Sequence, residues 1–123
     1  MTDAVAVRRI AATLPGVSDR STEASVVLRL GGKLFAWSWP EPAGPRRGRV
    51  PRLDVLVLPC APEAKETIVE ADPDKFFVTS HYRAYPLVLL RLDTVDEAEL
   101  ASILLSAWRS VAPPALQEQL RPA

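Results

Sequence analysis

Several residue types are scarce in this chain of 123 residues, and each scarcity excludes a class of function. Cysteine and histidine occur once each, as Cys60 and His81. An intrachain disulfide is therefore impossible, and these two residues cannot complete a four-ligand Cys/His zinc site. The acidic residues lack the spacing of a calcium loop, and no phosphate-binding glycine motif follows a predicted strand. We therefore expect neither a metal nor a cofactor.

The chain also has no net charge, because 15 Lys and Arg residues balance 15 Asp and Glu residues. Zero net charge argues against a surface built as a whole for polyanions, but it is compatible with a local basic patch. The longest apolar runs, such as residues 87–90, are far shorter than the roughly 20 residues of a membrane-spanning helix. The N-terminus lacks the basic-then-apolar order of a signal peptide, so we expect a cytoplasmic protein without a membrane partner.

Helical and strand periodicities do occur in the chain, whose length suits one domain. We predict three helices, each begun by a capping residue or an early proline, at residues 3–14, 61–71 and 97–112. Apolar alternation predicts four strands, at residues 25–30, 34–39, 53–58 and 86–92. The first two strands would be joined by a Gly31–Gly32 hairpin turn. Trp108 falls on the apolar stripe of the last helix, and we predict that it is buried.

This order predicts an α+β fold, in which an antiparallel sheet of about four strands is packed by three helices in the order α-β-β-β-α-β-α. The predicted domain spans residues 1–114 and is followed by a polar tail at 115–123.

Residues 40–52 are rich in proline, glycine and arginine and are predicted to form a loop. Phe35, Trp37 and Trp39 alternate and should share one sheet face, where the tryptophans either enter the core or stack on bases.

Six stretches cover nearly the whole chain: TLPGV at 13–17, GGKLFAW at 31–37, LDVLVL at 53–58, EAKETIVEADPDKFF at 63–77, HYRAYPLVLLRLD at 81–93 and ELASILLSAWRSVAP at 99–113. Their order and spacing resemble those of the MmcQ/YjbR family of small bacterial proteins. The resemblance implies a frataxin-like, double-wing α+β fold. It also implies DNA binding, a term that the family name often carries, and it implies no catalytic triad or cofactor.

One stretch departs from the family pattern. Many members carry a His-Met-Asn-Lys-type stretch followed by an aromatic residue, usually in a His-Trp pair, where this chain has the shorter HYRAYP. Only His81 matches the histidine of that stretch, and Tyr85 stands in for the later aromatic residue. If this stretch contacts a ligand elsewhere in the family, the resemblance does not carry that contact over to this chain.

The leading functional hypothesis is a non-enzymatic DNA-binding protein that contacts phosphates through a basic loop. Arginine's planar guanidinium matches phosphate oxygens, and five arginines are candidates for these contacts. They are Arg46, Arg47, Arg49 and Arg52 in the 40–52 loop, and Arg83.

An alternative hypothesis is a protein- or small-ligand-interaction module with no nucleic-acid role. It would use a pocket between sheet and helices near His81, Tyr82 and Tyr85, in a connecting loop where we expect the tyrosines to be exposed. A third hypothesis is an enzyme centred on His81, because an unperturbed histidine side chain suits general acid–base catalysis near neutral pH. No nucleophile motif accompanies the histidine, so we expect that the protein is not an enzyme.

Overall fold

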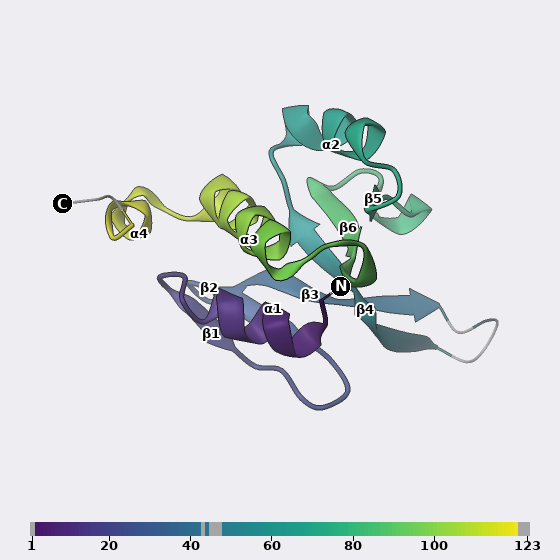
Figure 1. Ribbon diagram of the computed structural model, residues 1–123, viewed down its shortest axis with the longest axis horizontal. Coiled ribbons are helices and arrows are strands. Elements are labelled where there is room, and N and C mark those ends of the chain that lie inside the picture. Colours follow the sequence, from purple (N-terminus) through teal and green to yellow (C-terminus); the bar gives the residue numbers. More distant parts are fainter. Residues whose placement is uncertain (1, 43, 45–47, 121–123) are drawn as a thin grey trace.

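The computed structural model describes residues 2–42, 44 and 48–120 and contains a six-stranded antiparallel sheet (Figure 1). The strands lie in the order β1-β2-β3-β4-β6-β5. Their bounds are Val17–Asp19 for β1, Val27–Leu30 for β2, Lys33–Pro42 for β3, Arg49–Pro59 for β4, Phe76–Phe77 for β5 and Leu87–Arg91 for β6. The predicted meander of three strands is present as β2-β3-β4, and the Gly31–Gly32 turn has the positive φ angles that tight hairpins require.

Helices pack on one face of this sheet. They are α1 (Ala4–Ala11), α2 (Lys65–Ala71), α3 (Glu97–Val111) and α4 (Pro114–Glu118), with short 3₁₀ turns η1 (Pro62–Ala64), η2 (Ser80–Tyr82) and η3 (Leu92–Thr94). Asp3 and Asp96 cap α1 and α3 as predicted, since their carboxylates accept from the backbone N–H groups of Ala6 and Glu99. No helix in the described part of the chain is long and apolar enough to cross a membrane.

The two faces of the sheet carry different cores. Leu56, Leu58, Val88 and Leu90 point to the helix side and join the main core around Trp108. The intervening residues Val55, Val57 and Leu89 of the same strands form a second cluster on the opposite face, which Tyr82 from η2 completes. Because side chains alternate along a strand, β4 and β6 are buried on both faces. A layer of helices covers one face, and a loop with aromatic side chains covers the other.

The prediction of a shared sheet face is confirmed for Trp37 and Trp39 but was wrong for Phe35. Phe35 lies in the main core, whereas Trp37 and Trp39 pack half-buried against the second cluster. The cause is an irregularity in the β2–β3 pairing, where the register shifts between Leu28 and Arg29. An extra residue in one strand of an antiparallel pair interrupts the alternation of side chains.

The strand count was underestimated, because β1 and β5 were not predicted. These strands have three and two residues, too few for alternation to be recognised. The predicted polar tail also begins with a helix, α4, which has Pro114 at its start. Its Leu116 is partly buried against the main core, and therefore the first part of the tail packs on the domain.

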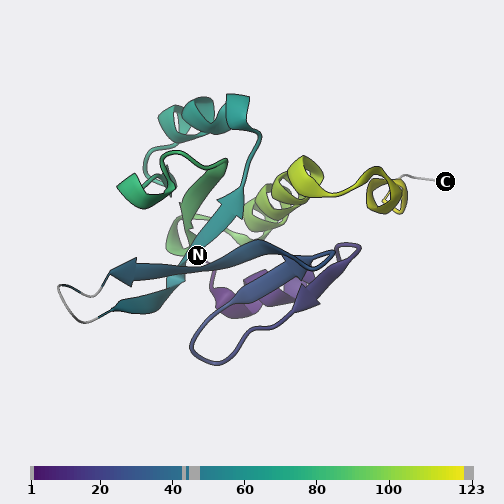
Figure 2. The ribbon, with the colours of Figure 1, turned by 180° about the vertical axis from the view of Figure 1, so that it is seen from behind.

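Most of the segment 40–52 was wrongly predicted to be a loop. β3 continues to Pro42 and β4 begins at Arg49, with Pro40 paired opposite Pro51. We call the outer parts of these two strands, residues 38–42 of β3 and 49–54 of β4, the arm. The arm is two-stranded, because β2 pairs with β3 only as far as Trp37 and β6 pairs with β4 only as far as Val55. Each strand of the arm therefore has one free edge, where proline's missing N–H is tolerated. The arm projects beyond the rest of the domain (Figure 2).

Candidate functional site

Most aromatic side chains gather on the sheet face that the helices leave uncovered. We call this set the aromatic face: Trp37, Trp39, Phe77, His81, Tyr82 and Tyr85. The rings form contacts at centroid distances of 4.7–6.4 Å, including an edge-on contact between Trp39 and Phe77 at 5.6 Å. Such tilted and edge-to-face geometries are those that aromatic pairs prefer.

The aromatic face is partly open to solvent. Tyr85 is 54% exposed, His81 is exposed, and Trp37, Trp39 and Phe77 are half-buried. Tyr82 was predicted to be exposed, but it is buried because its ring packs on Val55, Val57 and Leu89 beneath η2. The structure thus exposes His81 and Tyr85, and the buried ring of Tyr82, which contacts both Trp37 and His81, links them to the tryptophans.

A lysine from α2 holds the loop that carries these residues. The Lys65 ammonium donates to the carbonyl oxygens of Tyr82 at 2.8 Å, Arg83 at 3.1 Å and Tyr85. Three acceptors satisfy all three N–H donors of the ammonium group. The position of the loop on the sheet is therefore coupled to the position of α2.

The arginines of the arm differ in whether acidic side chains pair with them. Arg52 donates to both Glu41 and Asp54, and its distance to the Asp54 carboxylate is 2.7 Å. The Asp54 and Glu41 carboxylates raise the pKa of Arg52, and Arg52 lowers that of Asp54. Arg52 lies opposite Trp39 on the neighbouring strand, so its charge sits at the aromatic face but is already neutralised.

The other predicted phosphate contacts are distributed along the arm and the loop. Arg49 is exposed, and its guanidinium donates to the Pro40 carbonyl at 3.0 Å. Arg83 is exposed directly after η2, and neither arginine forms an ion pair with a described acid. Arg46 and Arg47 lie outside the described residues. Of the predicted arginines, the structure therefore leaves Arg49 and Arg83 as exposed cations.

The surroundings of His81 do not assemble catalytic groups. Its imidazole ring lies against the rings of Tyr82 and Tyr85. The Thr79 hydroxyl, two residues away, is buried without a hydrogen-bond partner. Among the described residues, no three His, Cys, Asp or Glu side chains lie close enough to hold a metal ion. The geometry around His81 thus suits ring stacking better than proton transfer.

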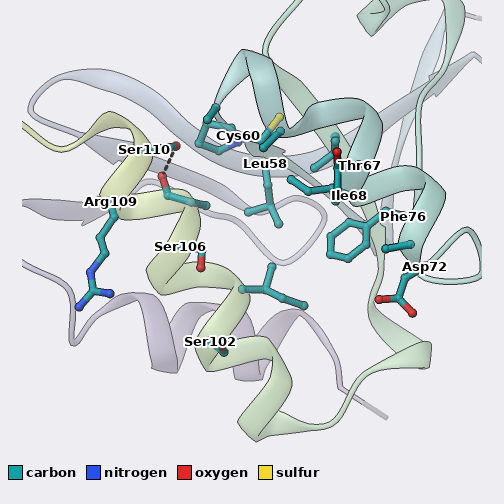
Figure 3. Close-up of a pocket in the computed structure, with 17 residues that line it drawn as sticks. Leu58, Cys60, Thr67, Ile68, Asp72, Phe76, Ser102, Ser106, Arg109 and Ser110 are labelled. Carbon is teal, nitrogen blue, oxygen red and sulfur yellow. Dashed lines mark hydrogen bonds between the residues drawn. The ribbon is translucent and has the colours of Figure 1, made fainter.

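A second candidate site is a cavity of about 650 Å³ between α2 and α3, which sequence reasoning missed (Figure 3). Its floor is formed by buried residues at the ends of β4 and β6, namely Leu58, Cys60 and Val88. Burial raises the pKa of the Cys60 thiol. The cavity does not reach Tyr82 or Tyr85, so the predicted pocket near those tyrosines is displaced to the other face of the sheet.

Small side chains on the facing helices create this cavity. From α3, Ser102, Ser106 and Ser110 follow one another at intervals of four residues, while Ile68 and Phe76 lie across from them (Figure 3). Alanines line the α2 side at positions 61, 64 and 71. The serine spacing was available in the sequence, but only the packing of α2 on the sheet shows that the serines face another element.

Comparisons with known proteins agree with this architecture. The YjbR family model matches residues 12–110. The chain belongs to the YjbR family. Uncharacterised proteins Mb2600 of Mycobacterium bovis and Rv2570 of Mycobacterium tuberculosis are each 28% identical to this YjbR-family chain over 114 residues, covering 87% of it and 86% of the relative.

A solved structure shares the fold of this YjbR-family protein. It is the crystal structure of the Deinococcus radiodurans protein DR2400, described as a DUF419 domain. The TM-score is 0.59 at 19% identity, and the match covers 93% of this chain and 84% of that chain. The family resemblance predicted from the six sequence stretches is therefore confirmed, as is the α+β class with an antiparallel sheet.

Proposed function

We propose that this YjbR-family protein binds DNA without catalysing a reaction and holds a single strand on its aromatic face. The observation that carries this proposal is the gathering of Trp37, Trp39, Phe77, His81 and Tyr85 on one sheet face. Stacking of a base on an aromatic side chain contributes about 1–3 kcal/mol and tolerates any sequence, because every base has a π face. A half-open aromatic surface therefore suits unpaired bases better than a closed duplex.

Phosphate contacts would come from exposed arginines beside this surface. Arg49 and Arg83 support the proposal as exposed cations, and Arg46 and Arg47 belong to the segment that joins the two strands of the arm. Arg52 contributes less because two carboxylates already hold its guanidinium. The proposal therefore has fewer phosphate contacts than the sequence predicted, and base stacking supplies part of the binding affinity.

The test is binding of fluorescent oligothymidine and of a random duplex, measured by anisotropy across a salt series. Three to four phosphate contacts predict a log–log salt slope of about −2 to −3 for the single strand, since each contact contributes about −0.7. We expect the single strand to bind more tightly than the duplex. Tighter duplex binding, or no binding at low salt, would contradict the proposal.

A substitution at an exposed ring tests the contribution of stacking to oligothymidine binding separately from that of charge. Tyr85→Ala should weaken oligothymidine binding about tenfold and leave the salt slope unchanged, because it removes a stacking surface and no cation. Val5→Ala on α1 is the matched control, since Val5 is also exposed but lies on the helix side. Equal oligothymidine affinities for wild type and Tyr85→Ala would show that the aromatic face is not the binding surface.

A second candidate function is a ligand-interaction module without a nucleic-acid role. The cavity between α2 and α3 favours it, because a volume of about 650 Å³ falls within the range of roughly 300–1,000 Å³ that small-molecule sites occupy. This candidate uses the helix-covered face, and the DNA proposal uses the opposite one. Separate variants can therefore test the two functions independently.

A further inference from the structure

We propose that the cavity between α2 and α3 binds an uncharged aliphatic chain that ends in a hydrogen-bonding head group. This inference rests on the second candidate function and specifies its ligand class. It does not depend on DNA binding, since the aromatic face lies on the other side of the sheet.

The floor of the cavity excludes a buried charge in the ligand. Leu58, Ile68, Val88 and Ile103 present aliphatic surface, and Phe76 is the single aromatic ring among the residues that line the cavity. Transfer of a charged group into such surroundings without a partner is strongly unfavourable. The part of the ligand that contacts the floor must therefore be apolar.

Charged side chains stand only at the ends of the cavity. Asp72 lies at one end and Arg109 at the other, and the Arg109 guanidinium is directed away from the α2 side (Figure 3). Both side chains are exposed, and Arg109 is directed away from α2, so neither offers a desolvated partner for a charged head group between the helices. This distribution favours an uncharged ligand over a fatty acid or an amine.

The α3 wall supplies hydrogen-bonding groups along an elongated path. Ser102 and Ser110 are eight residues apart, so the wall runs for about 12 Å at 1.5 Å per residue. The Ser110 hydroxyl donates to the Ala107 carbonyl and can still accept a hydrogen bond. The Ser102 and Ser106 hydroxyls make no hydrogen bond to the described residues. An elongated apolar floor beside hydroxyls matches an extended chain with an alcohol or ester head.

A homologous series of primary alcohols tests this assignment on the full chain. Amide shifts of Ile68 and Ser106 would be followed by NMR during titration with 1-hexanol, 1-octanol and 1-decanol. Each added methylene should tighten binding about fourfold, the equivalent of about 0.8 kcal/mol per buried methylene, until the cavity is full. The alcohols should also slow alkylation of Cys60 by iodoacetamide, because its thiol lines the cavity.

Two variants on α3 provide the matched comparison. Ser106→Phe places a ring in the cavity and should weaken 1-decanol binding at least tenfold. Ala101→Phe places the same ring on an exposed position that does not line the cavity, and it should leave binding within twofold of wild type. Both positions are exposed, so thermal unfolding should confirm that both variants fold.

Three results would overturn the proposal: affinities independent of chain length, equal binding by Ser106→Phe and wild type, or decanoate binding tenfold more tightly than 1-decanol. Oligothymidine binding by Ser106→Phe should equal that of wild type. Failure of the alcohol series therefore leaves the DNA proposal untouched, and failure of DNA binding leaves this one untouched.

Discussion

The two faces of the sheet are covered by different kinds of side chain. On the helix-covered face, Leu and Val residues of β4 and β6 share one core with residues of α1 and α3, and Trp108 is completely buried. On the other face no helix is available, and the large rings of Trp37 and Trp39 cover the strands under a loop. An aromatic side chain covers more area than an aliphatic one and tolerates partial contact with water. The face without helices is therefore both a secondary core and a surface with exposed rings.

The comparison also separates two kinds of anchoring. Hydrophobic contacts hold the helices, and the Trp108 indole N–H adds a bond to the Pro15 carbonyl at 2.9 Å. The loop over the aromatic face depends on Tyr82 and on the hydrogen bonds from Lys65. We expect the helix-covered face to dominate global stability and the aromatic face to show local opening.

The largest effect should come from Trp108→Ala, which leaves a void in the main core and removes the hydrogen bond to the half-buried Pro15 carbonyl. We expect a loss of about 3–5 kcal/mol in the free energy of unfolding. Trp37→Ala on the aromatic face should cost about 1–2 kcal/mol, since its ring is only half-buried. Urea unfolding measures both, and equal losses would show that the two faces contribute alike.

A smaller and more local effect is expected for Lys65→Met, which keeps the aliphatic stem but removes the ammonium. Charge-assisted hydrogen bonds contribute about 1.5–3 kcal/mol, so amide exchange at Tyr85 and Leu87 should accelerate about ten- to a hundredfold. Lys33→Met, at an exposed hairpin position, is the control. Unchanged exchange in the loop would mean that Tyr82 alone fixes it.

The smallest effect concerns the ion pairs of the arm and their dependence on pH. The Arg52 guanidinium holds the pKa of Asp54 below its ordinary value, so the carboxylate stabilises the fold above that value. This contribution is lost as pH falls through the folded-state pKa. Asp54→Asn should lower stability by less than about 1 kcal/mol at neutral pH, because the side chain is 53% exposed.

The two pH profiles should converge below the pKa of the folded state, since both side chains are then uncharged. Asp93→Asn serves as the control, because Asp93 is exposed and forms no ion pair with a described residue. A constant gap between Asp54→Asn and wild type across all pH values would indicate a packing effect. Oligothymidine binding by Asp54→Asn should strengthen slightly, since one of the two acids that hold Arg52 is removed.

Local patterns by themselves determined much of the fold. Asp3 and Asp96 marked helix starts, the Gly31–Gly32 pair marked the hairpin, and the apolar stripe of the last helix predicted the burial of Trp108. These features depend on residues within one or two turns of each other, so their signals lie together in the sequence. The six stretches that resemble the YjbR family likewise appear in order along the chain.

The candidate sites depended on the tertiary structure. Arg52 looks like a free cation in sequence, but strand pairing brings Glu41 beside it from eleven residues away. Tyr82 looks like a loop residue, but the loop folds back over β4 and β6 and buries it. The cavity requires α2 and α3, which are separated by residues 72–96 in the chain, to face each other across a shared floor. Local sequence specifies helices, strands and turns, whereas the pairing of charges and the space between elements arise only when distant segments pack together.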